Sequence, residues 1–308
     1  MNIVLTGSLG NISKPLTQLL VANGHLVTVI SSKAERISDI EALGAVAAIG
    51  TIQDVNFLTE TFKGADAVYL MEAWEGIGSL FDQNIDFVAE FEKIADNYVE
   101  AVQQSGVRQI IHLSSIGAHS DQGTSSLLVH HKVENILKKL PENVSVKFIR
   151  PVGFFSNVYR WLPMIKSQGA IIQSYGGDQK EPWVSPYDIA QTVADEMDQP
   201  FVGRTVHYVA SDEVSPNQIA ELLGEAIGNN DLKWTVYPNP SSGILNINTA
   251  NFSETVSLSI ADLNGRIVYT DENFDTQKTV DIHKLESGMY LVKIVSDGTI
   301  YTQKIIKN

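Results

Sequence analysis

The chain has 308 residues, which is enough for one large domain and a smaller one. Hydrophobic residues make up 44% and charged residues 19%, the proportions of a globular protein. The net charge of −14 argues against nucleic acid as a partner. The absence of cysteine excludes disulfides, thiolate metal sites and cysteine nucleophiles. No run approaches the ~20 apolar residues of a membrane span.

Residues 2–33 have the pattern of a strand, a glycine turn, a helix and a second strand. Residues 2–6 form a short apolar run, which is typical of a buried parallel strand. Gly7 and Gly10 follow directly, ahead of a helical pattern. The peptide N–H groups of such a turn point outward, and the helix dipole favours a phosphate there. The stretch therefore predicts a dinucleotide site, with Ser13 where a third glycine often stands.

In this interpretation Gly7 lets the turn close, and Gly10 lets a pyrophosphate approach the backbone. The alternative is a glycine turn that serves only tight packing between the strand and the helix. Under the first interpretation, the cofactor-binding residues expected in the turn are Gly7, Ser8, Gly10, Asn11 and Ile12.

The end of the second strand selects between NAD and NADP. A carboxylate at this place would bind the ribose 2′-hydroxyl of NAD. This chain instead has Ser31, Ser32 and Lys33, with Arg36 one turn further on. Hydroxyl groups and cations suit a 2′-phosphate, so we expect NADP as the cofactor, with NAD possible. The alternative for this segment is a solvated loop.

Strands and helices alternate through the first two thirds of the chain. This order is typical of the α/β class, a Rossmann-like doubly wound parallel sheet with helices on both faces. Ligands bind such sheets beyond the carboxyl ends of the strands, which adds Met71, Glu72, Ser114 and Ser115 to the expected cofactor-binding residues. After the second strand, the expected strands are 45–49, 66–71, 109–113 and 144–149, and the expected helices are 54–62, 82–105 and 127–140.

Residues 151–236 are less regular, and a substrate lobe is expected there. Two Ser-Pro pairs in this region place a capping serine before a proline at the first helical position. The helices expected in this region are 157–167, 185–198 and 215–227.

The pattern changes at Tyr237, where a joint rich in Pro, Ser and Gly is followed by apolar–polar alternation with a period of two. The dipeptides Asn-Gly at 264–265 and Asp-Gly at 297–298 mark two hairpins. No helical pattern is visible here, so we expect a small all-β antiparallel sandwich. The expected domains are 1–236 and 237–308.

The first domain resembles the NmrA-like family of atypical short-chain dehydrogenases. The motifs that carry the resemblance are MNIVLTGSLGNISKPL, GADAVYLM, GVRQIIHLSSIGAH, HHKVENIL and VKFIRPVGFFSN. The resemblance implies a Rossmann fold that binds NADP or NAD. The family includes quinone reductases and redox-sensing regulators that catalyse no reaction. NmrA-like chains usually continue with further helices after the segment matching DLKWTV, so we expect the C-terminal part of this domain to be truncated.

The tail resembles the C-terminal sorting domain of type IX secretion substrates from Bacteroidetes. The matching stretches are VYPNPSSGILNI, DLNGRIVY, LESGMYLVKI and the closing KIIKN. The resemblance implies export and removal of the tail. Type IX cargo also needs an N-terminal signal peptide, whereas Met1 runs straight into the first strand. We therefore expect a cytoplasmic protein; the alternative is a secreted or surface location, with the secretion machinery as partner only if an export signal is supplied.

Standard short-chain dehydrogenases use a Tyr-x-x-x-Lys pair, in which the tyrosine donates a proton. Lys132 matches the lysine, but Leu128 stands four residues earlier. Lys132 is therefore expected to hold the ribose or to polarise the substrate, and otherwise to be a solvated helix lysine. His130 and His131 point to different faces of the same helix, so one of them could face the nicotinamide and donate a proton, and His131 joins Lys132 as a candidate catalytic residue. The alternative is that both are surface or packing histidines.

These features predict an NADP(H)-binding oxidoreductase that reduces a quinone or similar carbonyl acceptor. In quinone reduction the hydride comes from the cofactor, and the reduced oxygen can take its proton from solvent. The alternative is a non-catalytic redox sensor, which the missing tyrosine favours. The expected partner is a small-molecule substrate. No metal constellation stands out.

Overall fold

The computed structural model describes residues 1–73, 85–122, 127–168, 177–226, 234–249, 252, 256–263, 265–274, 277–296 and 298–308. The chain forms two compact units. The first comprises Met1–Phe155 and Trp183–Ser211, and the second comprises Ser156–Pro182 and Asp212–Asn308. The division into domains 1–236 and 237–308 stays a prediction.

The first unit is built on a seven-stranded parallel sheet of order β3-β2-β1-β4-β5-β6-β9. The order reverses at β1, which is the switch point of a doubly wound sheet. The Rossmann-like α/β prediction is therefore confirmed. The strands are β1 (Asn2–Leu5), β2 (Leu26–Ser31), β3 (Val46–Ile49), β4 (Ala67–Leu70), β5 (Gln109–Leu113), β6 (Ser145–Pro151) and β9 (Arg204–Val209).

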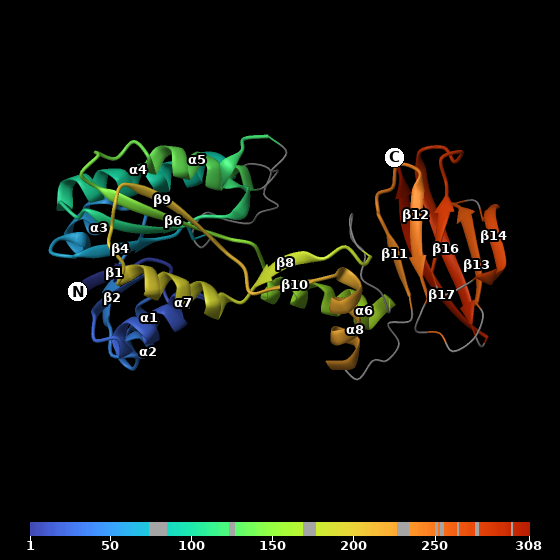
Figure 1. Ribbon diagram of the computed structural model, residues 1–308, viewed down its shortest axis with the longest axis horizontal. Coiled ribbons are helices and arrows are strands. Elements are labelled where there is room, and N and C mark those ends of the chain that lie inside the picture. Colours follow the sequence, from blue (N-terminus) through green and yellow to red (C-terminus); the bar gives the residue numbers. More distant parts are fainter. Residues whose placement is uncertain are drawn as a thin grey trace. The chain divides into compact units, whose positions relative to one another are not determined.

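Helices cover both faces of this sheet, with α1 and α7 on one face and α4 and α5 on the other (Figure 1). Local signals set their ends. The Asp54 carboxylate accepts hydrogen bonds at the start of α3, as expected of a cap, and the Ser185 hydroxyl does the same for α7. The helices are α1 (Ser13–Ala22), α2 (Ile37–Glu41), α3 (Val55–Phe62), α4 (Phe87–Ser105), α5 (Leu128–Leu137) and α7 (Pro186–Met197), with 3₁₀ helices η1 (Ala34–Arg36) and η2 (Ile116–His119).

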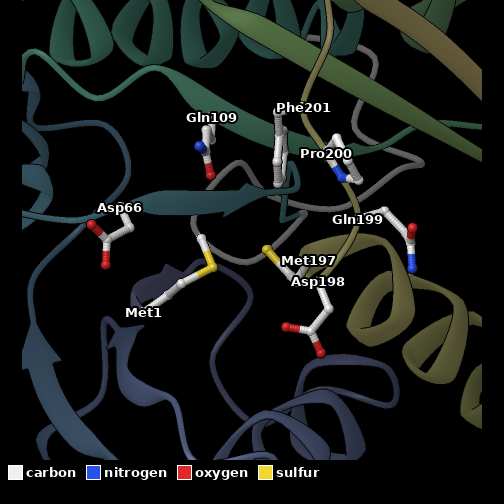
Figure 2. A pocket seen from close by; sticks show the side chains of 8 residues that line it. All are labelled: Met1, Asp66, Gln109, Met197, Asp198, Gln199, Pro200 and Phe201. Carbon is white, nitrogen blue, oxygen red and sulfur yellow. The ribbon is translucent and has the colours of Figure 1, made fainter.

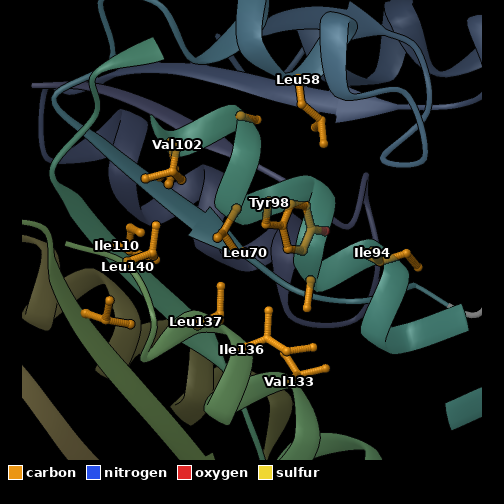
Figure 3. Close-up of a cluster of buried hydrophobic side chains, with 14 of the residues drawn as sticks. Leu58, Leu70, Ile94, Tyr98, Val102, Ile110, Val133, Ile136, Leu137 and Leu140 are labelled. Atoms are coloured by element: carbon orange, nitrogen blue, oxygen red, sulfur yellow. The ribbon is translucent and has the colours of Figure 1, made fainter. Parts of the chain in front are cut away.

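Apolar side chains fill the core between the parallel sheet and helices α4 and α5. Figure 3 shows the inward-facing side chains of α4 and α5 meeting Leu70 and Ile110 of the strands. Tyr98 is fully buried among them, and its hydroxyl donates to the Met71 carbonyl oxygen at 2.6 Å. The helix predicted at 82–105 is present from Phe87, and residues 82–84 lie outside the described residues.

Short elements occupy the segment predicted as a substrate lobe. The helix expected at 157–167 is present as a 3₁₀ helix followed by a short α-helix, and the helix expected at 215–227 is α8, with Ile227 outside the described residues. The elements are β7 (Gly153–Phe154), η4 (Phe155–Trp161), α6 (Leu162–Gln168), β8 (Glu181–Val184), β10 (Asp212–Val214) and α8 (Pro216–Ala226).

The tail forms two antiparallel sheets, β11-β12-β15 and β14-β13-β16-β17, around one apolar core, so the sandwich prediction is confirmed. Both predicted hairpins pair as expected, β13 with β14 and β16 with β17, while Asn264 and Asp297 lie outside the described residues. The strands are β11 (Thr235–Tyr237), β12 (Ile244–Asn248), β13 (Val256–Asp262), β14 (Ile267–Phe274), β15 (Gln277–Asp281), β16 (Gly288–Ser296) and β17 (Thr299–Lys307).

The sandwich core includes residues that precede the predicted boundary. Trp234 is 2% exposed and Val236 is 1% exposed, and both belong to the core formed by the tail strands. β11 spans the predicted boundary and pairs with β12. A truncation that preserves whole strands therefore removes residues 234–308 rather than 238–308.

We expect the chain ending at residue 233 to keep its NADPH affinity, because the glycine turn and the parallel sheet belong to the first unit. The chain ending at residue 237 should aggregate more readily, because Trp234 and Val236 lose their core. Calorimetric titration and thermal unfolding of the two truncations test this. Loss of NADPH binding in the shorter chain would mean that the tail is needed by the first domain, against the two-domain prediction.

Candidate functional site at the carboxyl edge of the parallel sheet

The glycine turn after β1 adopts a left-handed backbone at two successive positions. Gly7 has a φ of +87° and Ser8 a φ of +52°. The turn then closes through a hydrogen bond from the Gly10 peptide N–H to the Gly7 carbonyl oxygen at 3.2 Å. A β-carbon at Gly7 would lie 2.7 Å from the Ser13 hydroxyl oxygen and would overlap the Met71 sulfur. Both the backbone conformation and the packing therefore require glycine at position 7.

The same turn presents open hydrogen-bond donors at the start of α1. The Lys14 peptide N–H donates to the Gly10 carbonyl oxygen at 3.0 Å. By contrast, the peptide N–H groups of Asn11 and Ile12 have no acceptor among the described residues. Gly10 and Asn11 are exposed, and a β-carbon at Gly10 would have only the Gly7 carbonyl oxygen within 4 Å. This open donor surface at a helix N-terminus fits a pyrophosphate.

Ser13, which replaces the third glycine of the pattern, is accommodated without loosening the packing. It is fully buried, and its hydroxyl donates to the Thr6 carbonyl oxygen at 3.2 Å. Thr6 in turn accepts a hydrogen bond from the Met71 peptide N–H at 2.8 Å. The substitution thus adds a hydrogen bond between the strand and the helix.

The residues expected to select the cofactor lie next to the turn. The Ser8 hydroxyl donates to the Ser31 hydroxyl at 2.9 Å, and the Ser31 hydroxyl also accepts the Lys33 peptide N–H at 3.2 Å. Ser31 is buried, whereas Ser32 and Arg36 are exposed. Ser31 therefore ties the two loops together, and the Arg36 guanidinium lies 3.4 Å from the Asp39 carboxylate.

The predicted residues after β4 and β5 separate into two groups. Met71 lies against the glycine turn, and Ser115 is half-buried at the start of η2. Glu72 is buried, and its carboxylate lies 3.1 Å from Nε2 of His112. Ser114 is buried as well, and its hydroxyl donates to the Glu134 carboxylate. The side chains of Glu72 and Ser114 thus face protein groups beneath the edge of the sheet.

The two candidate catalytic residues both lie on α5. Lys132 is exposed, and its amine lies 3.6 Å from the Glu92 carboxylate of α4. Nδ1 of His131 lies 3.0 Å from the Ala118 carbonyl oxygen, and its Nε2 lies 2.9 Å from the Asn135 amide. Among the described residues, neither side chain makes a hydrogen bond to the glycine turn, and their catalytic roles stay predictions.

His130, rather than His131, faces the interior. Its Nδ1 is buried and has no hydrogen-bond partner among the described residues. Burial lowers the pKa of His130, the Glu72 carboxylate raises it, and charge on His112 lowers it further, so the ring is neutral at pH 7. The sequence holds a signal for this orientation, because His130 shares the face of α5 with Val133 and Leu137, which are buried.

Buried polar groups also form a network around the Glu134 carboxylate of α5. The Arg150 guanidinium donates to both carboxylate oxygens of Glu134, at 2.8 and 2.7 Å, and also to the Tyr208 hydroxyl at 2.9 Å. Lys138 adds a bond to Glu134 at 3.0 Å. Burial raises the pKa of Glu134, but the hydrogen bonds from Arg150, Ser114 and Lys138 outweigh it and hold that pKa below its usual value. Glu134 is therefore a paired carboxylate at neutral pH.

A pocket of about 640 Å³ lies at the opposite edge of the same sheet (Figure 2). Met1, Asp66 and Gln109 stand at the amino ends of β1, β4 and β5. Ligands of parallel sheets bind beyond the carboxyl ends, so the glycine turn and not this pocket is the candidate dinucleotide site. The lining residues are Met1, Asp66, Gln109, Met197, Asp198, Gln199, Pro200 and Phe201.

Within the described parts of the chain, no group of three or more His, Asp or Glu side chains could hold a metal ion. None of the helices in these parts has both the length and the apolar character that crossing a bilayer requires.

Comparisons with known proteins agree with this geometry. Residues 235–308 match the family described as the secretion system C-terminal sorting domain. Sterol demethylase protein B of Methylococcus capsulatus is 24% identical over 123 residues, 38% of this chain and 35% of that protein, so the chain spans about a third of its length.

Solved structures share the fold of the first unit. A nucleoside-diphosphate-sugar epimerase from Staphylococcus aureus superposes with a TM-score of 0.60 at 21% identity, over 74% of this chain and 77% of that chain. An NADPH-dependent quinone oxidoreductase from Escherichia coli, solved with NADPH, gives 0.60 at 19% identity, over 73% and 75%. Residues 7–200 match the family described as NAD(P)H-binding, a range that begins at Gly7 of the glycine turn. This chain belongs to the NAD(P)H-binding family.

Proposed function

We propose that the protein binds NADPH at the glycine turn and reduces a quinone or a similar carbonyl acceptor. The observation that carries the proposal is the turn itself, where the peptide N–H groups of Asn11 and Ile12 lack acceptors among the described residues beside the exposed Gly10. These groups would hold the pyrophosphate, and Ser32, Lys33 and Arg36 would hold the 2′-phosphate. When bound, the cofactor supplies the hydride.

We choose a quinone as the acceptor because α5 lacks the proton-donating tyrosine of short-chain dehydrogenases. Leu128 stands where a short-chain dehydrogenase would place its proton-donating tyrosine. Alcohol–ketone chemistry depends on that donor, whereas a reduced quinone is stable enough to take its proton from a weaker source. The Escherichia coli neighbour named as a quinone oxidoreductase supports this acceptor class. The same leucine favours the second candidate, a redox sensor that binds the dinucleotide without turnover.

Steady-state oxidation of NADPH with a panel of quinones tests the proposal. Oxidation that depends on both protein and quinone supports a reductase. Tight NADPH binding without oxidation by any quinone of the panel would instead establish the sensor.

Lys33→Ala should weaken NADPH binding by ~1–2 kcal/mol, the value of a hydrogen bond to a charged group, and should leave NADH binding nearly unchanged. The reason is that only NADPH carries the 2′-phosphate. Calorimetric titration with both cofactors measures the difference. Lys14→Ala is the matched control, because Lys14 is an exposed lysine on α1 rather than after β2. Equal losses for the two cofactors in Lys33→Ala would refute the NADP assignment.

The tail supports a proposal on location. Its match to a sorting domain favours export by the secretion system to the cell surface or beyond, and gives no support to the expected cytoplasmic location. Fractionation of cells that express the intact chain or the chain ending at residue 233 tests this. Retention of both forms inside the cell would contradict export.

A further inference from the structure

We propose that His112 is a positioning residue for the dinucleotide: through the buried Glu72 carboxylate it fixes Met71 against the glycine turn and keeps the turn in its binding conformation. The inference rests on the proposed function and names what holds that site in shape. His112 lies in β5, Met71 and Glu72 directly follow β4, and the turn directly follows β1. Because β4 pairs with both β1 and β5, these places share one carboxyl edge of the parallel sheet.

The glycine turn needs support because one of its residues is strained. Ser8 has a φ of +52°, a left-handed conformation that a residue with a β-carbon rarely adopts. Conformations of this kind persist where the surrounding structure enforces them. The same backbone shape allows the Ser8 peptide N–H to donate to the Ile30 carbonyl oxygen at 3.1 Å, and the Gly10 peptide N–H to donate to Gly7. The donors proposed for the pyrophosphate keep their orientation as long as this shape is kept.

Met71 supplies part of that support. Its sulfur packs so closely on Gly7 that a β-carbon there would overlap it, and the Ser13 hydroxyl lies 3.7 Å from the same sulfur. The backbone of Met71 is also held at both of its polar groups. Its N–H donates to the Thr6 hydroxyl at 2.8 Å, and its carbonyl oxygen accepts from the Tyr98 hydroxyl at 2.6 Å. Met71 therefore connects the end of β1 with α1 and α4 beside the turn.

A fully buried pair fixes the residue that follows Met71. Nε2 of His112 lies 3.1 and 3.2 Å from the two carboxylate oxygens of Glu72, and the side chains are 0% and 1% exposed. Such a pair adds little net stability, because the cost of removing both groups from water offsets their attraction. It can instead specify a single arrangement of the chain. Here that arrangement is the path of the chain as it leaves β4, which sets the place of Met71.

Loss of the imidazole would move this segment away from the turn. A buried carboxylate without a partner is so unfavourable that the group turns toward water. Glu72 reaches water by rotating the segment after β4, and this rotation withdraws Met71 from Gly7. Ser8 then relaxes from its left-handed conformation, and a smaller fraction of the molecules has the turn ready for a ligand. The apparent dissociation constant rises in inverse proportion to that fraction.

The place of the contact predicts how the two cofactors are affected. The turn faces the pyrophosphate, which NADPH and NADH share. A turn that is less often in its binding conformation should therefore weaken both cofactors by the same factor. Lys33→Ala, by contrast, is expected to weaken NADPH alone.

The first test is calorimetric titration of His112→Leu with both cofactors. We expect the dissociation constants for NADPH and for NADH to rise by the same factor, about 10-fold. His112→Gln is the conservative variant, because its amide can still form a hydrogen bond with the Glu72 carboxylate, and it should restore both affinities to within about twofold of the wild type. Arg150→Met is the control, since it breaks the buried pair with Glu134 in the same unit and should leave both dissociation constants unchanged below its melting temperature.

Three results would overturn the proposal. Wild-type affinities in His112→Leu would mean that the turn does not depend on the pair. Equal losses in His112→Leu and Arg150→Met would reflect stability rather than position. A loss in His112→Gln as large as that in His112→Leu would mean that the hydrogen bond to Glu72 is not the cause.

The second test is hydrogen exchange of the protein without cofactor. The peptide N–H groups of Ser8 and Gly10 are hydrogen-bonded at the turn, and that of Asn23 is bonded to the Leu19 carbonyl oxygen at the far end of α1. In His112→Leu, the N–H groups of Ser8 and Gly10 should exchange at least ~10-fold faster relative to Asn23 than in the wild type. Arg150→Met should leave that ratio unchanged. An unchanged ratio in His112→Leu would overturn the proposal, because the turn would keep its shape without the pair.

Failure of the proposed function has a different signature. A wild-type protein that binds neither cofactor contradicts the proposed function, and with it the role of His112 in dinucleotide binding. A wild-type protein that binds NADPH, together with wild-type affinity and exchange in His112→Leu, contradicts the positioning role alone.

Discussion

Gly10→Val is expected to abolish dinucleotide binding. Gly10 is exposed, and it stands directly before the peptide N–H groups of Asn11 and Ile12, which have no acceptor among the described residues. An isopropyl group there occupies the space through which a pyrophosphate must approach those donors. Losing the phosphate contacts should reduce the affinity for NADPH by at least ~100-fold, about 2.7 kcal/mol, which calorimetric titration measures directly.

The fold should survive this change. The one described heavy atom within 4 Å of a β-carbon at Gly10 is the Gly7 carbonyl oxygen, at 3.2 Å, so a small local shift relieves the contact. Gly288→Val is the control, because Gly288 has no neighbour within 4 Å of its β-carbon position and lies in the sandwich strand β16. Wild-type NADPH affinity in Gly10→Val would mean that the cofactor binds elsewhere.

Arg150→Met is expected to destabilise the first unit by ~3–5 kcal/mol, the usual cost of leaving one charge of a buried pair uncompensated. Glu134 is fully buried, and Arg150 supplies two of its hydrogen bonds, at 2.8 and 2.7 Å. Arg266→Met is the control, because Arg266 pairs with Asp262 at 3.1 Å but is 79% exposed. Pairs of this kind contribute less than ~1 kcal/mol. Urea unfolding of the two variants measures the difference.

The pH dependence of stability provides an independent check on the same pair. The folded-state pKa of Glu134 is lowered, so the unfolded state binds its proton more readily. The stabilisation is therefore present above the usual glutamate pKa, which is 4.5, and is lost as the pH falls through the lower folded-state value. The difference in stability between Arg150→Met and the wild type should shrink below about pH 4. A constant difference from pH 7 to pH 3 would contradict a charged Glu134.

Local sequence determined most of the first unit and the tail. The glycine turn was predictable because a left-handed backbone is cheap only for glycine, and Gly7 has a φ of +87°. The start of α3 was predictable because the Asp54 carboxylate caps N–H groups two and three residues ahead of it. The sandwich strands followed from alternation with a period of two, which reflects one buried and one exposed face.

Tertiary structure decided the features that depend on distant residues. The seventh strand, β9, escaped prediction because it is an edge strand: Val206 and Tyr208 are exposed, so its apolar residues do not mark a buried face. Trp234 and Val236 belong to the tail's core although they precede the change in pattern, because β11 is defined by its pairing with β12.

The same distinction applies to the candidate site. Its backbone donors follow from local sequence, whereas its buried side-chain contacts depend on tertiary structure. The residues of the turn could be read from seven consecutive letters, since the donors proposed for the pyrophosphate are backbone groups of neighbouring residues. Glu72 and His112 are 40 positions apart in the sequence, and no periodicity links them. Parallel pairing of β4 with β5 brings them to the same end of the sheet, and burial then forces the carboxylate to find the imidazole as its partner. The sequence alone therefore predicted the glycine turn that the structure contains, whereas the buried groups beneath it were set by the packing of the sheet against α4 and α5.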